Sequence, residues 1–429
     1  MARGTGKQTL LSCAAMRTRL IVSSLLFVAC NAGEGGDEET TIGTATATAT
    51  ATVPMTTEPG TTGMIEPTSE PGTSSTGSAL TTSVGTTGPD GTEDSGGFDD
   101  STGMVDPPDP PAVRYVGRYD DSDPAHVRLG WSGVGAVFRF NGTDAGVRLD
   151  DNGKYFTVVV DGQVQANLAT SPGEQTYPLA VGLPAGDHTV EFYRRTEGSF
   201  GPTTILGVEL NGGELLAPPP VQRRIEIVGD SITCGYGNEG VSPCSFSAET
   251  EDHYLTYGAL AARTLGAELS TVAWSGKGLV NNYDMDVFEP LPQLYDRVVA
   301  TDPAAWGFAW QPDVVVINLG TNDFSTGGDP SEEVFVSAYV AFLGHLRDVY
   351  PDAFILPVAP TLFGDEAIMV AGYLQSAVDQ RHAMGDLDVA FADVNVQWNG
   401  SGCDGHPNLE AHAGMAARLV QELQAHLGW

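Results

Sequence analysis

A serine that directly follows a short β-branched run is the residue with the clearest potential for chemistry. The run Ile225–Val228 has the composition of a buried strand, and Gly229-Asp230 makes a tight turn into Ser231. A buried strand would hold Ser231 rigidly, and the turn would expose its hydroxyl, as a nucleophile requires. A Gly-Asp-Ser turn is weak evidence by itself, because most such serines only cap or shape a turn.

The serine block and three later blocks, in their order along the chain, resemble the SGNH (GDSL-type) hydrolases. The four blocks are Gly229–Asn238, Ser275–Gly278, Gly320–Asp323 and Cys403–Asn408. The first of them, Gly-Asp-Ser-Ile-Thr-Cys-Gly-Tyr-Gly-Asn, looks most like carbohydrate esterase family 2, whose members remove acetyl groups from polysaccharides. The resemblance covers roughly residues 112–429.

This resemblance implies a serine esterase and a role for each matched residue. Ser231 would be the nucleophile, and His406, just before the last expected helix, would be the base that accepts its proton. The oxyanion would be held by the backbone N–H groups of Ser231 and Gly276 and by the neutral side-chain amide of Asn322. The mechanism needs no cofactor, and the histidines show no metal-ligand spacing, so no metal site is expected.

The general SGNH pattern places an aspartate three residues before the histidine, and this chain departs from it. Cys403 occupies that position and cannot serve as the usual orienting carboxylate. Asp404, two residues before His406, is the remaining candidate for the third catalytic residue. A backbone carbonyl could orient the imidazole instead. Both arrangements occur in carbohydrate esterase family 2, so the resemblance leaves a Ser–His dyad and a triad with Asp404 open.

Flat aromatic side chains suit the faces of sugar rings, and several occur in this half of the chain. Trp274, adjacent to the Ser275–Gly278 block, is the best candidate for substrate binding, and Tyr236 is a second. The other aromatic candidates are Trp306, Trp310 and Trp398. Asp230 and Asp323 invite comparison with the carboxylate pair of a glycosidase. Each adjoins a proposed catalytic residue, however, where this family uses such residues to support loops.

The N-terminus has the composition of an export signal. Arg17 and Arg19 precede the apolar run Leu20–Ala29, which is followed by Cys30. Phe27-Val28-Ala29-Cys30 resembles a bacterial lipoprotein signal, in which the cysteine is lipidated after cleavage, and an ordinary cleaved signal peptide is the alternative. The apolar run is short for a transmembrane helix, and no later stretch qualifies. We therefore expect a cell-envelope lipoprotein or an extracellular protein, with Cys30 as the lipid anchor.

Export predicts an oxidising compartment, in which a disulfide can persist. With Cys13 and Cys30 set aside, Cys234, Cys244 and Cys403 can form at most one bridge within the chain. The sequence does not choose the pair. Cys234 and Cys403 each lie three residues from a proposed catalytic residue, which would bring them near each other. Three reduced cysteines are an equal alternative.

Composition divides the chain into a signal, a low-complexity segment and two folded regions. The formal net charge of −35 argues against nucleic acid as a partner. After the signal at 1–30, residues 31–111 are rich in Thr, Gly, Ser and Pro, acidic and free of Lys and Arg, which predicts a disordered tether. Residues 112–219 hold short strand-like runs between turn residues, which predicts an all-β sandwich of the jelly-roll type. Ala217–Pro220 is a stiff boundary to residues 222–429.

In residues 222–429, apolar strands alternate with helical patterns, which predicts an α/β domain with a mainly parallel sheet covered on both faces. The expected strands are Ile225–Val228, Val314–Leu319, Phe354–Val358 and Val389–Val394, and the expected helices are 254–266, 331–349, 365–384 and 409–427. In the SGNH family this domain is a three-layer α/β/α structure of flavodoxin-like topology. Ligand sites in such sheets lie at the carboxyl ends of the strands, where Ser231 and Asn322 fall.

Together these features predict a secreted or surface-anchored serine esterase that removes O-acetyl groups from xylan- or mannan-type polysaccharides, as an acetylxylan esterase does. We expect a monomer. An esterase for another acyl group, on cell-wall or lipid esters, is one alternative. A surface carbohydrate-binding protein is another, although it would not need Ser231, Gly276, Asn322 and His406 together. The sequence identifies neither the polysaccharide nor the hydroxyl position, nor whether the β domain binds sugar.

Overall fold

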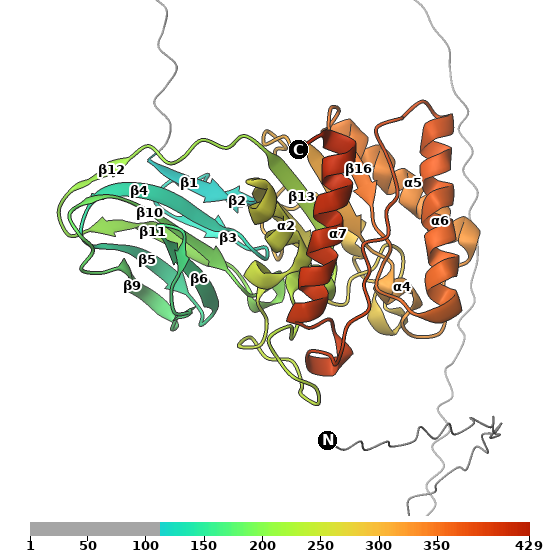
Figure 1. Cartoon of the computed structure of the whole chain (residues 1–429), viewed down its shortest axis with the longest axis horizontal. Coiled ribbons are helices and arrows are strands. Elements are labelled where there is room, and N and C mark those ends of the chain that lie inside the picture. Colours follow the sequence, from blue (N-terminus) through green and yellow to red (C-terminus); the bar gives the residue numbers. More distant parts are fainter. Residues whose placement is uncertain (1–111) are drawn as a thin grey trace, which may run out of the picture. The chain divides into compact units, whose positions relative to one another are not determined.

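The structure is a computed structural model that describes residues 112–429 (Figure 1). The expected export signal, Cys30 and the tether at 31–111 lie outside the described residues. Among residues 112–429, none of the helices combines the length and the apolar character of a membrane span. An antiparallel β region comes first and an α/β region with a parallel sheet follows, both within one compact unit.

The β region consists of two antiparallel sheets. The first contains β1 (Val113–Val116), β4 (Gly135–Gly142), β6 (Tyr155–Val160), β7 (Gln163–Val164), β8 (Leu168–Ala169), β10 (Gly186–Arg194) and β12 (Glu214–Leu216). The second contains β2 (Tyr119–Asp120), β3 (Val127–Leu129), β5 (Ala145–Asp151), β9 (Gly173–Ala180) and β11 (Thr203–Leu210).

The apolar faces of these two sheets meet in a shared core. Residues of β5 and β10 alternate between more buried and more exposed positions, because successive side chains of a strand point to opposite faces. Phe138, Phe156 and Phe192 of the first sheet belong to the same buried cluster as Val147 and Leu149 of the second. That cluster continues into the α/β region, so the two regions share a hydrophobic core.

The α/β region is organised around β13 (Arg224–Gly229), the strand that leads to Ser231. Its parallel neighbours are β14 (Glu268–Ala273) and β15 (Val314–Asn318), and β15 pairs in turn with β16 (Phe354–Pro357). Strand β14 was not among the strands expected from the sequence, although it lies beside the strand that carries the candidate nucleophile.

The expected strand at 389–394 is less regular than the others. It runs parallel to β16, with isolated bridges from Val389 to Ile355 and from Ala392 to Val358. The last residue of β16, Pro357, has no N–H group, so it cannot donate to a continuous ladder.

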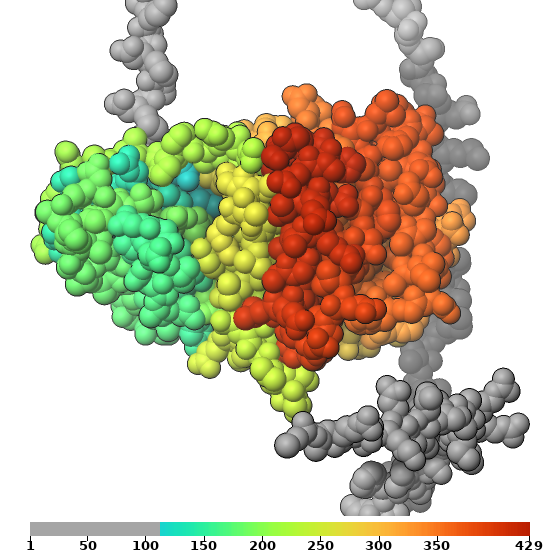
Figure 2. All heavy atoms as spheres, viewed as in Figure 1, coloured from blue at the N-terminus to red at the C-terminus, as the bar shows by residue number. Residues whose placement is uncertain are grey.

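Helices cover both faces of the parallel sheet (Figure 1). On one face lie α2 (Tyr257–Leu265) and α7 (Leu409–Leu427), and on the other lie α5 (Glu332–Val349) and α6 (Gly364–Ala383). In the space-filling view α7 forms a continuous ridge along the visible side of the α/β region (Figure 2). The expected helix at 254–266 begins only at Tyr257, because Thr256 caps it after a 3-10 turn, η2 (His253–Leu255).

Alternating strand residues show how the sheet is buried. Ile225 and Ile227 of β13 pack in the cluster with α2 and α7, whereas Val228 belongs to the cluster on the α5 and α6 side. The same alternation places Val316 and Ile317 of β15 in different clusters. Continuous apolar strands are expected where a sheet is buried on both faces.

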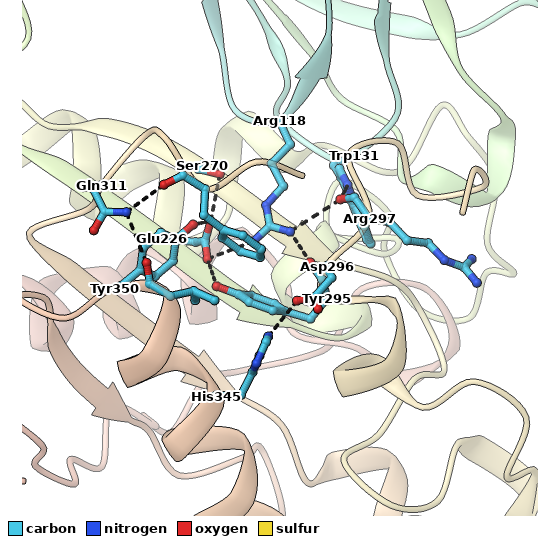
Figure 3. Close-up of polar contacts among 12 residues, drawn as sticks. Arg118, Trp131, Glu226, Ser270, Tyr295, Asp296, Arg297, Gln311, His345 and Tyr350 are labelled. Atoms are coloured by element: carbon cyan, nitrogen blue, oxygen red, sulfur yellow. Dashed lines mark hydrogen bonds and ion pairs between the residues drawn. The ribbon is translucent and has the colours of Figure 1, made fainter. Parts of the chain in front are cut away.

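One buried ion pair joins the two regions through the nucleophile strand (Figure 3). Arg118, from the turn between β1 and β2, donates from Nη2 to both carboxylate oxygens of Glu226 in β13, each at 3.2 Å. Neither side chain is exposed. Hydroxyl groups of Ser270, Tyr295 and Tyr350 also donate to this carboxylate. The β region therefore supplies the cation that neutralises a charge buried beneath the catalytic edge.

We predict that Arg118→Met lowers the free energy of unfolding by about 3–5 kcal/mol, because it leaves the Glu226 carboxylate buried without a cation. Urea unfolding followed by fluorescence measures the change. The double variant Arg118→Met/Glu226→Gln should recover part of the loss, since the charge is then gone. An Arg118→Met protein as stable as wild type would mean that the ion pair does not hold the regions together.

Candidate active site

The end of β13 places Ser231 at the carboxyl edge of the sheet. Gly229 is required in this turn, because a Cβ there would lie 2.0 Å from Oγ1 of Thr233. Asp230 caps the short helix α1 (Ser231–Cys234), with its side chain accepting a backbone N–H from the first turn. Ser231 is thus the first residue of a helix, where its own N–H has no intrahelical acceptor. That N–H is available to a bound anion or oxyanion.

His406 reaches Ser231 from near the end of the chain. It follows the turn η4 (Cys403–Gly405) and precedes α7, whose N-cap is Asn408. Its Nε2 lies 2.9 Å from Oγ of Ser231, so a neutral imidazole can accept the hydroxyl hydrogen. Burial lowers the pKa of His406 below its ordinary value of 6.5, which favours the neutral form. The pair has the contact that serine nucleophiles require.

The carboxylate of Asp404 does not reach the imidazole. Its Oδ2 accepts the hydroxyl of Tyr236 at 3.0 Å and the backbone N–H of Phe246 at 2.9 Å. Nδ1 of His406 is buried and makes no hydrogen bond of normal geometry within the described part of the chain. The backbone carbonyls of Cys403 and Asp404 still lie close enough to raise the pKa of His406, against the larger lowering by burial. This arrangement favours a Ser–His dyad over a triad with Asp404.

Tyr236 supports the imidazole by stacking. The ring centroids of Tyr236 and His406 are 4.1 Å apart, and those of Tyr236 and Phe246, which also stack, are 4.0 Å apart. Asp404 accepts the hydroxyl of Tyr236, whose ring packs against the base, and the backbone N–H of Phe246, whose ring packs on the other ring, Tyr236. The position of His406 therefore depends on Asp404 through packing.

A disulfide also restrains the turn that precedes His406. Cys244 is bonded to Cys403, and the N–H of Asp404 donates to the carbonyl of Cys244 at 3.0 Å. Cys234 is buried and reduced. Of the possibilities that the sequence left open, one bridge forms, and it does not include Cys234. The bridge ties the His406 turn to a segment 159 residues earlier in the chain.

Gly276 and Asn322 reach this edge from the neighbouring strands. Gly276 follows β14 with a φ of +79°, which favours glycine, and its N–H makes no hydrogen bond within the described residues. Asn322 lies in α4 (Thr321–Phe324), directly after β15, and is 7% exposed. Its Nδ2 donates to the carbonyl of Lys277 at 2.9 Å and lies 3.3 Å from Oδ2 of Asp230. A substrate oxyanion would compete with the longer contact.

Asp230 and Asp323 are both engaged in shaping these loops. The carboxylate of Asp323 accepts the N–H groups of Leu279, Val280 and Asn281 at 2.7–2.9 Å. Burial raises the pKa of Asp230 to about 7, although the backbone N–H that it caps pulls the other way. Carboxylates committed to such donors do not fit the acid and base of a glycosidase, which flank the bond to be cleaved.

The fold separates the aromatic residues singled out from the sequence. Tyr236 lies against His406, whereas Trp274 is half-buried, with its ring near Gly198 of the β region. The indole of Trp310 donates to Glu268, the first residue of β14 and thus at the opposite end of that strand from the site. Trp306 packs against Tyr119 in the β region. Of these aromatic residues, Tyr236 has the closest contact with the Ser–His pair.

Exposed aromatic side chains that were not singled out from the sequence flank the site. Tyr283 and Phe288 are 57% and 69% exposed and belong to the segment that follows the Ser275–Gly278 block. Phe363 is 71% exposed and packs with Trp398 at an open cleft of about 740 Å³ beside η4. Phe363 and Trp398 therefore line a concave surface, which is a candidate binding site. The sequence gives little signal for the exposed rings of Tyr283, Phe288 and Phe363, since Tyr and Phe are more often core residues.

Among the described residues, one buried cluster combines side chains of metal-ligand type. It consists of Glu197, Cys234 and Glu251, whose ligand atoms lie within 4.8 Å of one another. Burial, reinforced by the charge of Glu197, raises the pKa of the Cys234 thiol and of the Glu251 carboxyl. The backbone N–H of Glu197 also donates to Glu251 at 3.0 Å. Protons on Cys234 and Glu251 reduce the repulsion from the charge of Glu197 within this cluster.

We predict that Asp404→Asn lowers kcat by less than about tenfold, because the amide oxygen can still accept from Phe246 and no contact with His406 is lost. Loss of the carboxylate in the Ser-His-Asp triad of a trypsin-like protease costs about 10⁴ in kcat. Steady-state kinetics on an aryl acetate measures the difference. A loss approaching that size would restore Asp404 as a member of a triad.

The lowered pKa of His406 also predicts the pH dependence. The base must be neutral, so activity should persist below the ordinary histidine pKa, and the acid limb of kcat/KM should have its midpoint below 6.5. Asp230, whose pKa is raised to about 7, is a neighbouring group that could also produce an acid limb. If His406 produces the limb, its midpoint should be the same in Asp230→Asn as in wild type. A midpoint near 7 that disappears in this variant would contradict the assignment to His406.

Comparisons with known proteins agree with this arrangement. Residues 115–220 match the family model described as Carbohydrate esterase 2 N-terminal, and residues 227–413 match the GDSL-like Lipase/Acylhydrolase family. The chain is 40% identical over 331 residues to the cellulase/esterase CelE of Acetivibrio thermocellus, a match that covers 75% of this chain and 40% of CelE. This chain therefore spans less than half the length of CelE.

Two further relatives are covered almost completely. An acetylxylan esterase / glucomannan deacetylase of Cellvibrio japonicus is 27% identical over 327 residues, covering 74% of this chain and 90% of the relative. The solved structure of a family two carbohydrate esterase from Clostridium thermocellum in complex with cellohexaose is 38% identical, with a TM-score of 0.71, covering 74% of this chain and 99% of that one. The chain belongs to carbohydrate esterase family 2 and is a carboxylic ester hydrolase of the GDSL type.

Proposed function

We propose that this protein is a serine esterase that removes O-acetyl groups from polysaccharides of the xylan and glucomannan type. The observation that carries the proposal is the 2.9 Å contact between Oγ of Ser231 and Nε2 of His406. It occurs at the sheet edge that Gly276 and Asn322 also reach, so nucleophile, base and oxyanion donors converge.

Acylation begins when Oγ of Ser231 attacks the carbonyl carbon of the acetyl group and Nε2 of His406 takes the hydroxyl proton. The negative charge on the former carbonyl oxygen is stabilised by the N–H groups of Ser231 and Gly276 and by the amide of Asn322. The bond from the carbonyl carbon to the sugar oxygen then breaks. His406 gives its proton to that oxygen, and the acetyl group remains on Ser231 as an ester.

Deacylation repeats these steps with water. His406 removes a proton from the water as its oxygen attacks the acetyl carbon, and the same donors hold the second oxyanion. The bond to Oγ breaks, acetate leaves and His406 returns the proton to Ser231. In a dyad, the carbonyls of Cys403 and Asp404 assist the imidazolium that forms in each half-reaction, since they favour the protonated ring.

The surroundings of the site support a polysaccharide substrate. The exposed rings of Tyr283 and Phe288 belong to the segment bonded to Gly276 and Lys277, and the exposed ring of Phe363 lines the cleft that Gly405 also lines. Such rings offer flat surfaces to sugar rings. Relatives named for acetylxylan and glucomannan, and a related structure with cellohexaose, point to the same class of molecule. Trp274 is less exposed than these rings and contributes to the site mainly by packing.

We also propose a finer architecture for the two regions. The sheet order β14-β13-β15-β16, extended by the segment at 389–394, corresponds to the flavodoxin-like order, with helices on both faces making three α/β/α layers. The two sheets of the β region form a jelly-roll sandwich.

The exported chain is a monomer held at the cell envelope by a lipid on Cys30, with residues 31–111 as the tether.

We predict that the protein releases acetate from acetylated xylan and acetylated glucomannan, and that Ser231→Ala abolishes the release. The loss of the nucleophile should lower kcat by about 10⁶-fold, as in subtilisin. Enzymatic determination of free acetate measures the release from both substrates. Ser325→Ala is the matched control, because this exposed hydroxyl at the end of α4 donates only to the Thr321 carbonyl.

The alternatives give different outcomes in the same experiment. Activity on longer acyl esters but not on either polymer would make the protein an esterase for cell-wall or lipid esters. Binding of the polymers without acetate release, by folded wild-type protein, would make it a carbohydrate-binding protein. Equal activity of Ser231→Ala and wild type would contradict the proposed nucleophile.

A further inference from the structure

The β region contributes one carboxylate directly to the loop that carries Gly276. Glu197 follows the long strand β10 and is 4% exposed. Its Oε2 accepts the backbone N–H of Ser275 at 2.7 Å. Ser275 immediately precedes Gly276, the candidate oxyanion donor. A residue from outside the α/β region thus holds the peptide next to the donor.

Glu197 is itself held firmly enough to act as an anchor. Its N–H donates to Oε2 of Glu251 at 3.0 Å, and its Oε1 accepts the hydroxyl of Ser199 at 2.5 Å. The following residue is wedged between the two regions, because a Cβ on Gly198 would lie 2.5 Å from the Cβ of Ala300. The carboxylate therefore has little freedom to follow a moving loop.

The loop on the other side of this contact is held at several backbone groups, but not at the Gly276 N–H. The Gly276 carbonyl accepts the N–H of Tyr283 at 2.8 Å, and the Lys277 N–H donates to the Trp274 carbonyl at 3.2 Å. Gly276 adopts a positive φ and its N–H is unbonded within the described residues. Beyond it, the carbonyl of Lys277 accepts from Asn322, and Asp323 fixes the backbone from Leu279 onward. The contact with Glu197 adds a side-chain restraint on the β14 side, at the residue that precedes the Gly276 N–H.

We propose that Glu197 is a positioning residue for the esterase reaction: through the Ser275 N–H, the β region sets the direction of the Gly276 N–H toward the oxyanion. This inference rests on the proposed function and adds a catalytic reason for the β region. Glu197 touches neither substrate nor the reacting atoms. Its effect should appear in kcat, since an oxyanion donor acts mainly in the transition state.

Two conservative variants separate the reach of the side chain from its charge. Glu197→Gln keeps an oxygen at the same distance from Ser275, whereas Glu197→Asp keeps the charge but is one methylene shorter. We expect Glu197→Gln to retain kcat within about threefold. Glu197→Asp should lower kcat by about 10- to 100-fold with KM nearly unchanged, somewhat less than the full loss of an oxyanion donor.

Asp302→Ala is the matched control, because it removes another carboxylate that joins the regions, the one 2.9 Å from Arg128, without touching the loop. Its kcat should stay within about twofold of wild type. Hydrogen–deuterium exchange of the peptide from Ser275 to Gly278 gives a readout that does not need activity. Exchange should be faster in Glu197→Asp and unchanged in Glu197→Gln.

The outcomes distinguish this inference from the proposed function. If the wild-type protein releases no acetate, the esterase proposal is wrong. Hydrogen–deuterium exchange of the peptide from Ser275 to Gly278 would still test the contact between Glu197 and Ser275. Active wild type with unchanged kcat and unchanged exchange in Glu197→Asp overturns the role of Glu197. A loss in Glu197→Gln with normal activity in Glu197→Asp also overturns it, because charge and not the hydrogen bond would then matter.

Discussion

The structure depends on a carboxylate that the nucleophile strand cannot neutralise by itself. Glu226 lies fully buried in β13, and its cation, Arg118, comes from the β region. A buried charge without a partner is strongly destabilising, so the strand that presents Ser231 is stable only with the β region in place. The continuous hydrophobic core supports the same conclusion, because one cluster contains residues of both regions.

Carboxylates elsewhere in the site serve mainly as anchors for backbone. Asp323 binds consecutive N–H groups of the loop after Gly278, and Asp404 binds the hydroxyl of Tyr236 and the N–H of Phe246. A carboxylate that accepts such bonds fixes a loop without needing to change protonation. This division of roles leaves the imidazole of His406 to be placed by stacking and by a disulfide-closed turn.

The parts of the site that could be predicted are those written in short contiguous blocks. Ser231 and Asn322 directly follow apolar runs, and parallel strands bring such positions to one edge. Partners far apart in sequence could not be predicted: Cys244 with Cys403, or Glu197 with Ser275, since each depends on how separate loops pack. The same holds for Asp404, which lies near the base in sequence but bonds to other groups. Trp274, which was singled out for its position next to a motif, is half-buried near Gly198, and its role in substrate binding stays a prediction.

Together the two regions build an activated serine at the end of β13. Treatment with an alkyl fluorophosphonate, which reacts with activated serine hydroxyls, followed by peptide mass spectrometry tests this claim most directly. We predict that one label appears on the peptide containing Ser231, that activity falls in step with labelling, and that His406→Ala is labelled far more slowly. Active enzyme that resists the reagent, or carries the label on another serine, would contradict the claim.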